Sequence, residues 1–174
     1  AFNKLIREDI KDKQNSIIFV GLEKKDGISS IDITKESLNN EQWLFQKITA
    51  DESPQERKDI IFSFARGDTD VILAKRILDE GIDIPSIKTA IILASSVRRR
   101  QFVQRRGRVL RDDGSKKIAT IYDFIILPPT TFGKSGLFIM EKEMSRVKEM
   151  GQDAENKDEI IAFEKQYKGM YEPA

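Results

Sequence analysis

The chain has 174 residues, of which 39% are hydrophobic and 34% charged, and its formal net charge is +1. This composition is typical of a soluble globular domain, and no apolar run approaches the roughly 18 residues of a membrane span, so we expect a cytoplasmic or nuclear protein. The lack of cysteine and histidine excludes disulfides, thiolate metal sites and the usual general base near neutral pH.

The first third of the chain predicts two helices around a buried strand. We expect a polar helix or linker over residues 1–15 and a strand at Ser16–Val20, whose continuous apolar run is typical of a strand covered on both faces. Residues 21–33 carry two glycines and mixed charge, which predicts a loop or insertion. A helix is expected over 34–45 with Thr34 as its N-cap, and within it Trp43 is expected in the core rather than on a nucleic-acid base.

The sharpest local signal lies between residues 53 and 67. Ser53 as N-cap, Pro54 at the first helical position and Glu56 at the third form a capping box, and Gly67 ends the predicted helix. A short strand is expected just before this helix, at 47–50.

The remaining apolar runs predict three more strands, at 70–74, 89–94 and 118–126. Strands that alternate with helices over short connections indicate an α/β fold with a mainly parallel sheet. Two charged amphipathic helices are expected after Pro128-Pro129, at 137–150 and 159–170. The predicted organisation is therefore a linker or helix (1–15), a sheet domain (16–127) and a helical C-terminal extension (128–174).

Seven of the twelve arginines fall between Arg98 and Arg111, in the stretch RRRQFVQRRGRVLR. We expect this segment to be helical, and at about 100° per residue the predicted helix has two different faces. One face is apolar and carries Phe102, Val103, Val109 and Leu110. The opposite face presents Gln101, Gln104, Arg108 and Arg111. Paired guanidiniums suit phosphate, although a solvated basic face or a nonspecific nucleic-acid patch is the alternative for an arginine run taken alone.

Four segments, in order, resemble motifs of the C-terminal RecA-like lobe of superfamily 2 helicases and translocases. They are motif IV at 16–20, the helix before motif V at 55–67, motif V at 71–85 and motif VI at 104–111. LDEGIDIP and QRRGRVLR are most similar to the branch of DNA-repair and restriction-type enzymes. The resemblance covers residues 16–127 and implies a RecA-like three-layer sandwich.

The resemblance also implies site residues. In motif VI, Arg108 and Arg111 would be arginine fingers on the β- and γ-phosphates of ATP, with Gln104 near the γ-phosphate. In motif V, Gly81 would give a tight turn at the nucleotide and Asp83 would lie near its ribose. The residues expected to contact the nucleic-acid backbone are Lys75, Ser95, Ser96 and Arg100.

Several of these assignments have alternatives. Lys75 stands where the family usually has Ser or Thr, and a lysine would contact phosphate as a point charge. Ser95 and Ser96 could instead cap the following helix, and Arg98–Arg100 could be a solvated loop. No metal ligands are predicted in this chain.

ATP and Mg²⁺ would be held mainly by an N-terminal lobe, because this sequence contains neither a P-loop nor a Walker B motif. The nearest match, residues 130–135, follows Pro128-Pro129, which lack backbone N–H donors. The chain alone is therefore expected to be inactive as an ATP hydrolase. The expected partners are the N-terminal lobe, DNA with RNA as the alternative, no membrane, and a protein at the 128–174 hairpin. A RecA-like module that binds nucleic acid or protein without hydrolysis is the alternative function.

Overall fold

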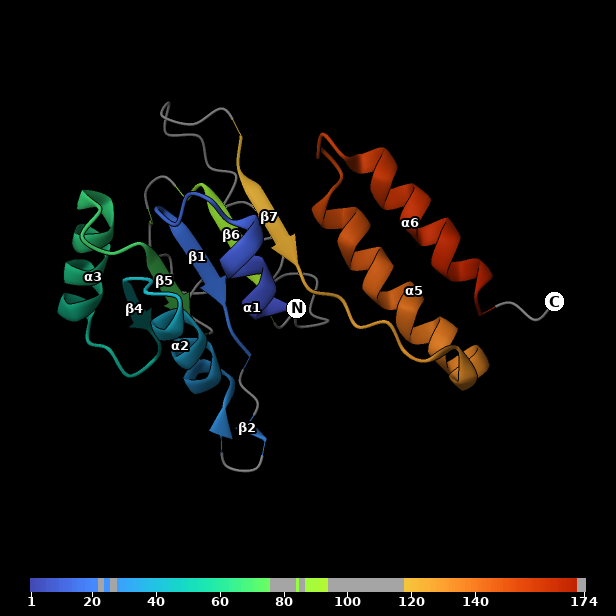
Figure 1. Ribbon diagram of the computed structural model, residues 1–174, viewed down its shortest axis with the longest axis horizontal. Coiled ribbons are helices and arrows are strands. Elements are labelled where there is room, and N and C mark those ends of the chain that lie inside the picture. The colour runs from blue at the N-terminus through green and yellow to red at the C-terminus, as the bar shows by residue number, and fades with distance from the viewer. Residues whose placement is uncertain (22–23, 26–27, 76–83, 85–86, 94–117, 172–174) are drawn as a thin grey trace. The chain divides into compact units, whose positions relative to one another are not determined.

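Figure 1 shows the computed structural model, which describes residues 1–171 apart from 22–23, 26–27, 76–83, 85–86 and 94–117. The described residues form two compact units, one that contains the sheet and reaches Phe124, and one from Ile125 onward. The predicted domain limits at 15/16 and 127/128 stay a prediction. The arginine-rich segment 98–111, predicted to be helical, lies outside the described residues.

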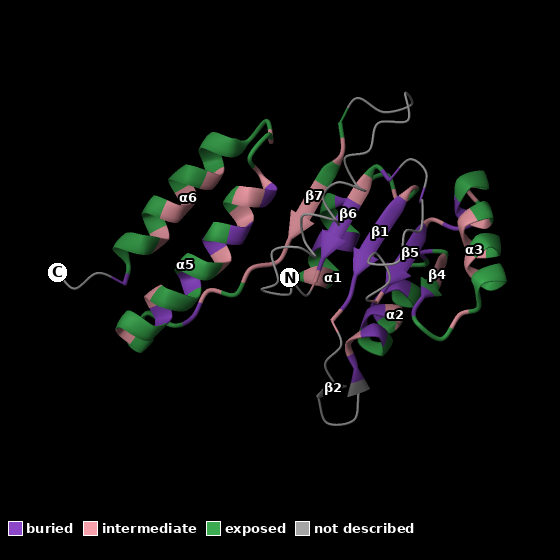
Figure 2. Cartoon of the chain, turned by 180° about the vertical axis from the view of Figure 1, so that it is seen from behind, coloured by how far each residue is buried: buried purple, intermediate pink, exposed green. Residues whose placement is uncertain are grey.

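The first unit is built on five parallel strands in the order β4-β5-β1-β6-β7. Their bounds are Ser16–Phe19 (β1), Phe45–Ile48 (β4), Val71–Ala74 (β5), Thr89–Ile92 (β6) and Thr120–Asp123 (β7). Figure 2 shows the central strands β1 and β5 buried along their whole length. The expected α/β fold with a parallel sheet is confirmed.

Successive residues of a strand point to opposite faces of the sheet. All residues of the central strands β1 and β5 are buried, so both faces of the sheet are covered there. On one face Ile18, Leu73 and Ile91, from three adjacent strands, belong to one hydrophobic cluster. On the other face Ile17 and Ile72 are also fully buried. The continuous apolar runs of these strands thus have the packing that a sheet between two covering layers requires.

The N-terminal segment contributes directly to this core. It forms a short α-helix (α1, Phe2–Lys4) and a π-helical turn (η1, Leu5–Asp9), after which the chain becomes extended at Ile10. Leu5, Ile6 and Ile10 are buried in the same cluster as the sheet residues. Within the segment 1–15, where a polar helix or linker was expected, helical structure is therefore confined to residues 2–9 and has an apolar side that packs in the core.

Residues 21–33 are more structured than expected. Two-residue strands, β2 (Lys24–Lys25) and β3 (Ile28–Ser29), pair antiparallel, and α2 (Ser30–Asn40) starts directly after them. The predicted N-cap at Thr34 is wrong: Ser29 is the cap, and it accepts a hydrogen bond from the Ile31 amide. The Thr34 hydroxyl donates to the Ser30 carbonyl inside the helix instead.

Trp43 lies outside α2, contrary to the helix expected over 34–45, because Gln42 adopts a left-handed conformation with φ 56° and the chain then enters β4. Its side chain is 3% exposed and belongs to the core cluster, as expected. Lys13 Nζ lies 5.6 Å from the centre of the Trp43 ring and donates to the Glu41 carbonyl at 3.0 Å.

Helix α3 (Pro54–Arg66) has the predicted bounds. Ser53 Oγ accepts from the Glu56 amide at 3.3 Å, and Glu56 Oε2 accepts from the Ser53 amide at 2.7 Å, so both halves of the capping box are present. Gly67 ends the helix with φ 80°, in the left-handed conformation that glycine adopts at no steric cost.

The second unit is a helical hairpin. A 3₁₀ turn (η3, Thr130–Phe132) leads into α5 (Gly133–Met150), and α6 (Lys157–Gly169) packs against α5. Its core contains Met140, Met144 and Tyr171, with half-buried side chains around them. Both helices match the two that were expected and begin a few residues earlier. Among the described residues no helix has the length and apolar character that crossing a membrane requires.

Candidate functional site

The parallel sheet brings the carboxyl ends of all five strands to one edge, where ligands of open α/β sheets bind. The backbone pairing continues one residue past four of the strands. The Lys75 amide donates to the Ile48 carbonyl at 3.1 Å, and the Val20 amide to the Ala74 carbonyl at 3.0 Å. The Leu93 amide donates to the Phe19 carbonyl at 3.0 Å, and the Phe124 amide to the Ile92 carbonyl at 3.1 Å. The chain segments that leave β5 and β6 therefore start on either side of the end of β1.

Lys75 is the one predicted site residue that the structure describes. It is half-buried and follows β5 directly, at the carboxyl edge of the sheet. The other eight lie outside the described residues: Gly81, Asp83, Ser95, Ser96, Arg100, Gln104, Arg108 and Arg111. Their positions stay a prediction.

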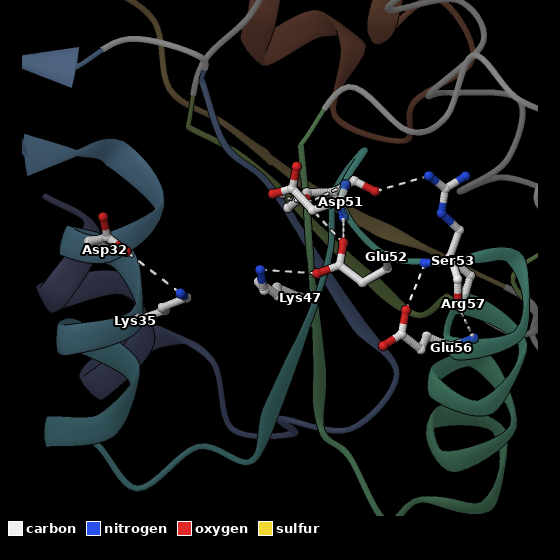
Figure 3. A network of polar contacts seen from close by, with 9 residues as sticks. Asp32, Lys35, Lys47, Asp51, Glu52, Ser53, Glu56 and Arg57 are labelled. Carbon is white, nitrogen blue, oxygen red and sulfur yellow. Dashed lines mark hydrogen bonds and ion pairs between the residues drawn. The ribbon is translucent and has the colours of Figure 1, made fainter.

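Figure 3 shows a polar network in the loop from β4 to α3, residues 49–53, which the sequence did not reveal. Lys75 is bonded through its amide to Ile48, the residue before this loop. Glu52 Oε2 accepts hydrogen bonds from the Thr49 amide at 2.5 Å and from Thr49 Oγ1 at 2.8 Å. Its other oxygen, Oε1, lies 3.0 Å from Lys47 Nζ. Only 11% of the Glu52 side chain is exposed, so its charge is held within the loop.

The charge states in this network follow from its contacts. Burial by itself raises the pKa of the Glu52 carboxyl, but the hydrogen bonds from Thr49 and the contact with Lys47 outweigh burial and leave the pKa below its ordinary value. The hydrogen bond to Glu52, together with the negative charge of that residue, raises the pKa of Lys47. Both groups are therefore ionised near neutral pH.

Two residues of α3 complete the loop. Arg57 Nη2 donates to the Thr49 carbonyl at 3.2 Å, and Glu56 closes the capping box on Ser53. The hydrogen bonds from Ser53 lower the pKa of the Glu56 carboxyl. The sequence signalled the cap, whereas the Lys47–Glu52 contact joins a strand to a loop and has no local pattern that would identify it.

Within the described part of the chain, no group of three or more Asp and Glu side chains is arranged to hold a metal ion. The polar groups at the described sheet edge are a lysine, an arginine, hydroxyls and carboxylates that are already paired. The lysine and the arginine are cations that donate hydrogen bonds, so they suit contacts to a polyanion more than proton transfer.

The family described as the helicase conserved C-terminal domain matches residues 1–113. A DNA 3'-5' translocase, XPB2 of Sulfurisphaera tokodaii, is 38% identical over 69 residues, which cover 40% of this chain and 16% of that protein. A Rad25 protein of Haloarcula marismortui is 30% identical over 105 residues, which cover 55% of this chain and 17% of that protein. The chain thus spans less than a fifth of the length of these relatives.

Solved structures share the fold. The C-terminal domain of the DEAD-box protein Dbp5 aligns with a TM-score of 0.61 at 18% identity, over 97% of this chain and 88% of that one. The C-terminal part of the Fun30 ATPase domain aligns with a TM-score of 0.64 at 20% identity, over 82% of this chain and 43% of that one. The chain belongs to the helicase conserved C-terminal domain family and has the RecA-like fold of superfamily 2 helicase C-terminal lobes.

Proposed function

We propose that this chain is the second RecA-like lobe of an ATP-dependent DNA helicase or translocase. The observation that carries the proposal is the family match over residues 1–113, which extends through the motif VI residues Gln104, Arg108 and Arg111. The name of the XPB2 relative supports DNA as the nucleic acid. RNA remains the alternative.

In this proposal Arg108 and Arg111 contact the phosphates of ATP, and Gln104 lies near the γ-phosphate. Fixed guanidiniums stabilise the negative charge that develops on the transferred phosphoryl group. Gly81 and Asp83 contact the nucleotide, whereas Lys75, Ser95, Ser96 and Arg100 contact the nucleic-acid backbone. The fit to ATP rests on the chemistry of these donors. A companion lobe in the whole protein holds most of the ATP and the Mg²⁺, so this chain alone is expected not to hydrolyse ATP.

The test is ATP hydrolysis by the whole protein with and without DNA. We expect Arg111→Ala to lower DNA-stimulated turnover by about a thousandfold or more while DNA binding is retained, as for other arginine fingers. Arg7→Ala is the matched control, because Arg7 is an exposed arginine paired only loosely with Glu8 at 3.8 Å. Normal turnover in Arg111→Ala contradicts the finger assignment.

The alternative is a RecA-like module that binds nucleic acid or protein without hydrolysis. A P-loop and a Walker B motif in the companion lobe favour the enzyme, and a companion lobe without them favours the module. Direct measurement of ATP turnover by the whole protein separates the two.

We also propose that the hairpin of α5 and α6 binds a protein. It exposes several large apolar side chains: Phe132, Phe138, Ile139, Ile161 and Met170. Exposed apolar groups of this kind are common in protein-binding surfaces. Deleting residues 128–174 from the whole protein without changing which proteins it binds contradicts this role.

A further inference from the structure

The loop from β4 to α3 carries two carboxylates, Asp51 and Glu52, at the same sheet edge as Lys75. Lys75 is adjacent to this loop, because its amide is bonded to Ile48, the last residue of β4. A carboxylate that faces solvent there would repel the phosphates that Lys75 is proposed to contact. Asp51 is exposed, whereas only 11% of the Glu52 side chain is exposed, so the loop encloses one of its two carboxylates.

Glu52 is directed into the loop and away from solvent. Thr49 supplies two hydrogen bonds, from its amide at 2.5 Å and its hydroxyl at 2.8 Å, and Lys47 supplies the opposite charge at 3.0 Å (Figure 3). The Thr49 carbonyl is fixed in turn by Arg57 at 3.2 Å. The loop is thus shaped so that one carboxylate is enclosed by three donors.

We propose that Lys47 is a positioning residue for nucleic-acid binding, which retains the Glu52 carboxylate inside the β4–α3 loop and keeps the phosphate path beside Lys75 free of that negative charge. The inference rests on the proposed function, because it needs nucleic acid at this edge. Lys47 acts through Glu52 in this arrangement and need not touch the nucleic acid.

Variants of Lys47 and Glu52 change the charge of this pair in ways that test the proposed role of Lys47. The Lys47–Glu52 pair is neutral as a whole. Lys47→Met leaves a carboxylate that is mostly buried without its cation, and such a group turns toward water. Glu52→Gln removes the carboxylate but leaves an amide oxygen that can still accept from Thr49. The double variant restores neutrality.

Three mechanisms predict different patterns in this double-mutant cycle. If Lys47 positions Glu52, Lys47→Met weakens binding, Glu52→Gln does not, and the double variant recovers. If Lys47 contacted phosphate itself, the double variant would stay as weak as Lys47→Met. If the pair only stabilised the loop, both single variants would weaken binding.

The experiment measures the binding of a fluorescein-labelled single-stranded DNA of about 20 nucleotides, longer than one lobe covers, by fluorescence anisotropy at low salt. We expect Lys47→Met to raise Kd about threefold to tenfold, and the double variant and Lys47→Arg to stay within about twofold of the unmodified chain. Thermal unfolding of each variant confirms that it is folded.

Lys88→Met is the matched control. Lys88 is exposed to a similar extent as Lys47, 48% against 43%, and also forms an ion pair, at 3.3 Å from Asp12, but it precedes β6 at the opposite edge of the sheet. We expect it to change Kd by less than about twofold, as for a remote exposed charge.

The inference is overturned if Lys47→Met behaves as Lys88→Met, or if Glu52→Gln fails to restore binding in the double variant. Lys75→Ala tests the proposed function separately, and we expect it to weaken binding. Absence of binding by the unmodified chain, or unchanged binding in Lys75→Ala, counts against the proposed function itself.

Discussion

The ring of Tyr171 lies directly against Gly136: a Cβ added at Gly136 would come within 2.8 Å of Tyr171 Cε1. The Tyr171 hydroxyl donates a hydrogen bond to the Pro128 carbonyl. These two contacts tie the residues after α6 to the segment before α5 and to the first turn of α5. The hairpin is therefore closed at its open end by one tyrosine.

Gly136→Ala tests this contact. We expect the substitution to lower the free energy of unfolding by about 1–3 kcal/mol, because the added methyl overpacks a well-filled site. Gly169→Ala is the control: a Cβ there meets nothing within 4 Å, so alanine should be neutral or slightly stabilising. Thermal unfolding followed by circular dichroism measures both, and equal losses in the two variants contradict the close packing.

The capping box at α3 predicts a second stability effect. Ser53→Ala removes the acceptor of the Glu56 amide, and we expect a loss of about 1 kcal/mol in the free energy of unfolding. Ser53→Asn keeps a side-chain acceptor and should retain most of the stability. Denaturant unfolding compares the two variants. If Ser53→Asn lowers the free energy of unfolding as much as Ser53→Ala does, the stabilising role assigned to the cap is wrong.

Helix α3 was predictable because its signals are local. The N-cap, the proline at the first helical position, the box residue and the final glycine lie within 15 positions, from Ser53 to Gly67, and each acts on the nearest turn of the backbone. The three central strands were predictable for a related reason. A parallel sheet covered on both faces needs continuous apolar runs, and such runs are visible in the sequence.

The start of α2 and the length of β7 were not predictable from local pattern. Both Ser29 and Thr34 can cap a helix, and the choice depends on the hairpin of β2 and β3 that precedes Ser30. Strand β7 pairs with β6 alone, over four residues, so the apolar run from Ile118 to Ile126 extends beyond it at both ends. Both of these end residues are exposed.

The candidate site was predictable only in part. Motif resemblance identifies Lys75 and the arginines by their positions in the sequence, and Lys75 follows β5 directly in the fold. Its contact with nucleic acid stays a prediction. The contact of Lys47 with Glu52 depends on how the loop after β4 turns back toward its own strand. Spacing along the chain does not encode that turn, so the structure was needed to find it.

Glu52 should make stability depend on pH. Burial alone raises the pKa of its carboxyl, but the contacts with Thr49 and Lys47 lower it further than burial raises it. A lowered pKa stabilises the fold above the ordinary value of about 4.3, and this contribution disappears as the pH falls through the lowered pKa.

We therefore expect Glu52→Gln to be less stable than the unmodified chain at pH 7, and this difference to shrink as the pH falls below about 4.3. Urea unfolding followed by the fluorescence of Trp43, which is the chain's one tryptophan and lies in the core of the sheet unit, measures the difference. The exposed Glu36→Gln serves as a control and should alter stability little. A difference that stays constant from pH 7 to acid contradicts the role of the ionised carboxylate.

The burial of Ile6 predicts that residues 1–10 stabilise the sheet unit and do not act as a free linker. Ile6 is 2% exposed and belongs to the cluster that contains Ile18 and Leu73 of the sheet. We expect Ile6→Ala to lower the free energy of unfolding by about 2–5 kcal/mol, through lost apolar contact and the cavity left behind. Ile33→Ala makes the same chemical change at a side chain that is 53% exposed, and it should cost far less. Urea unfolding followed by Trp43 fluorescence reports on the shared core in both variants. If the two substitutions prove equally mild, the N-terminal segment contributes little to the stability of the sheet unit, and the predicted limit at residue 16 gains support.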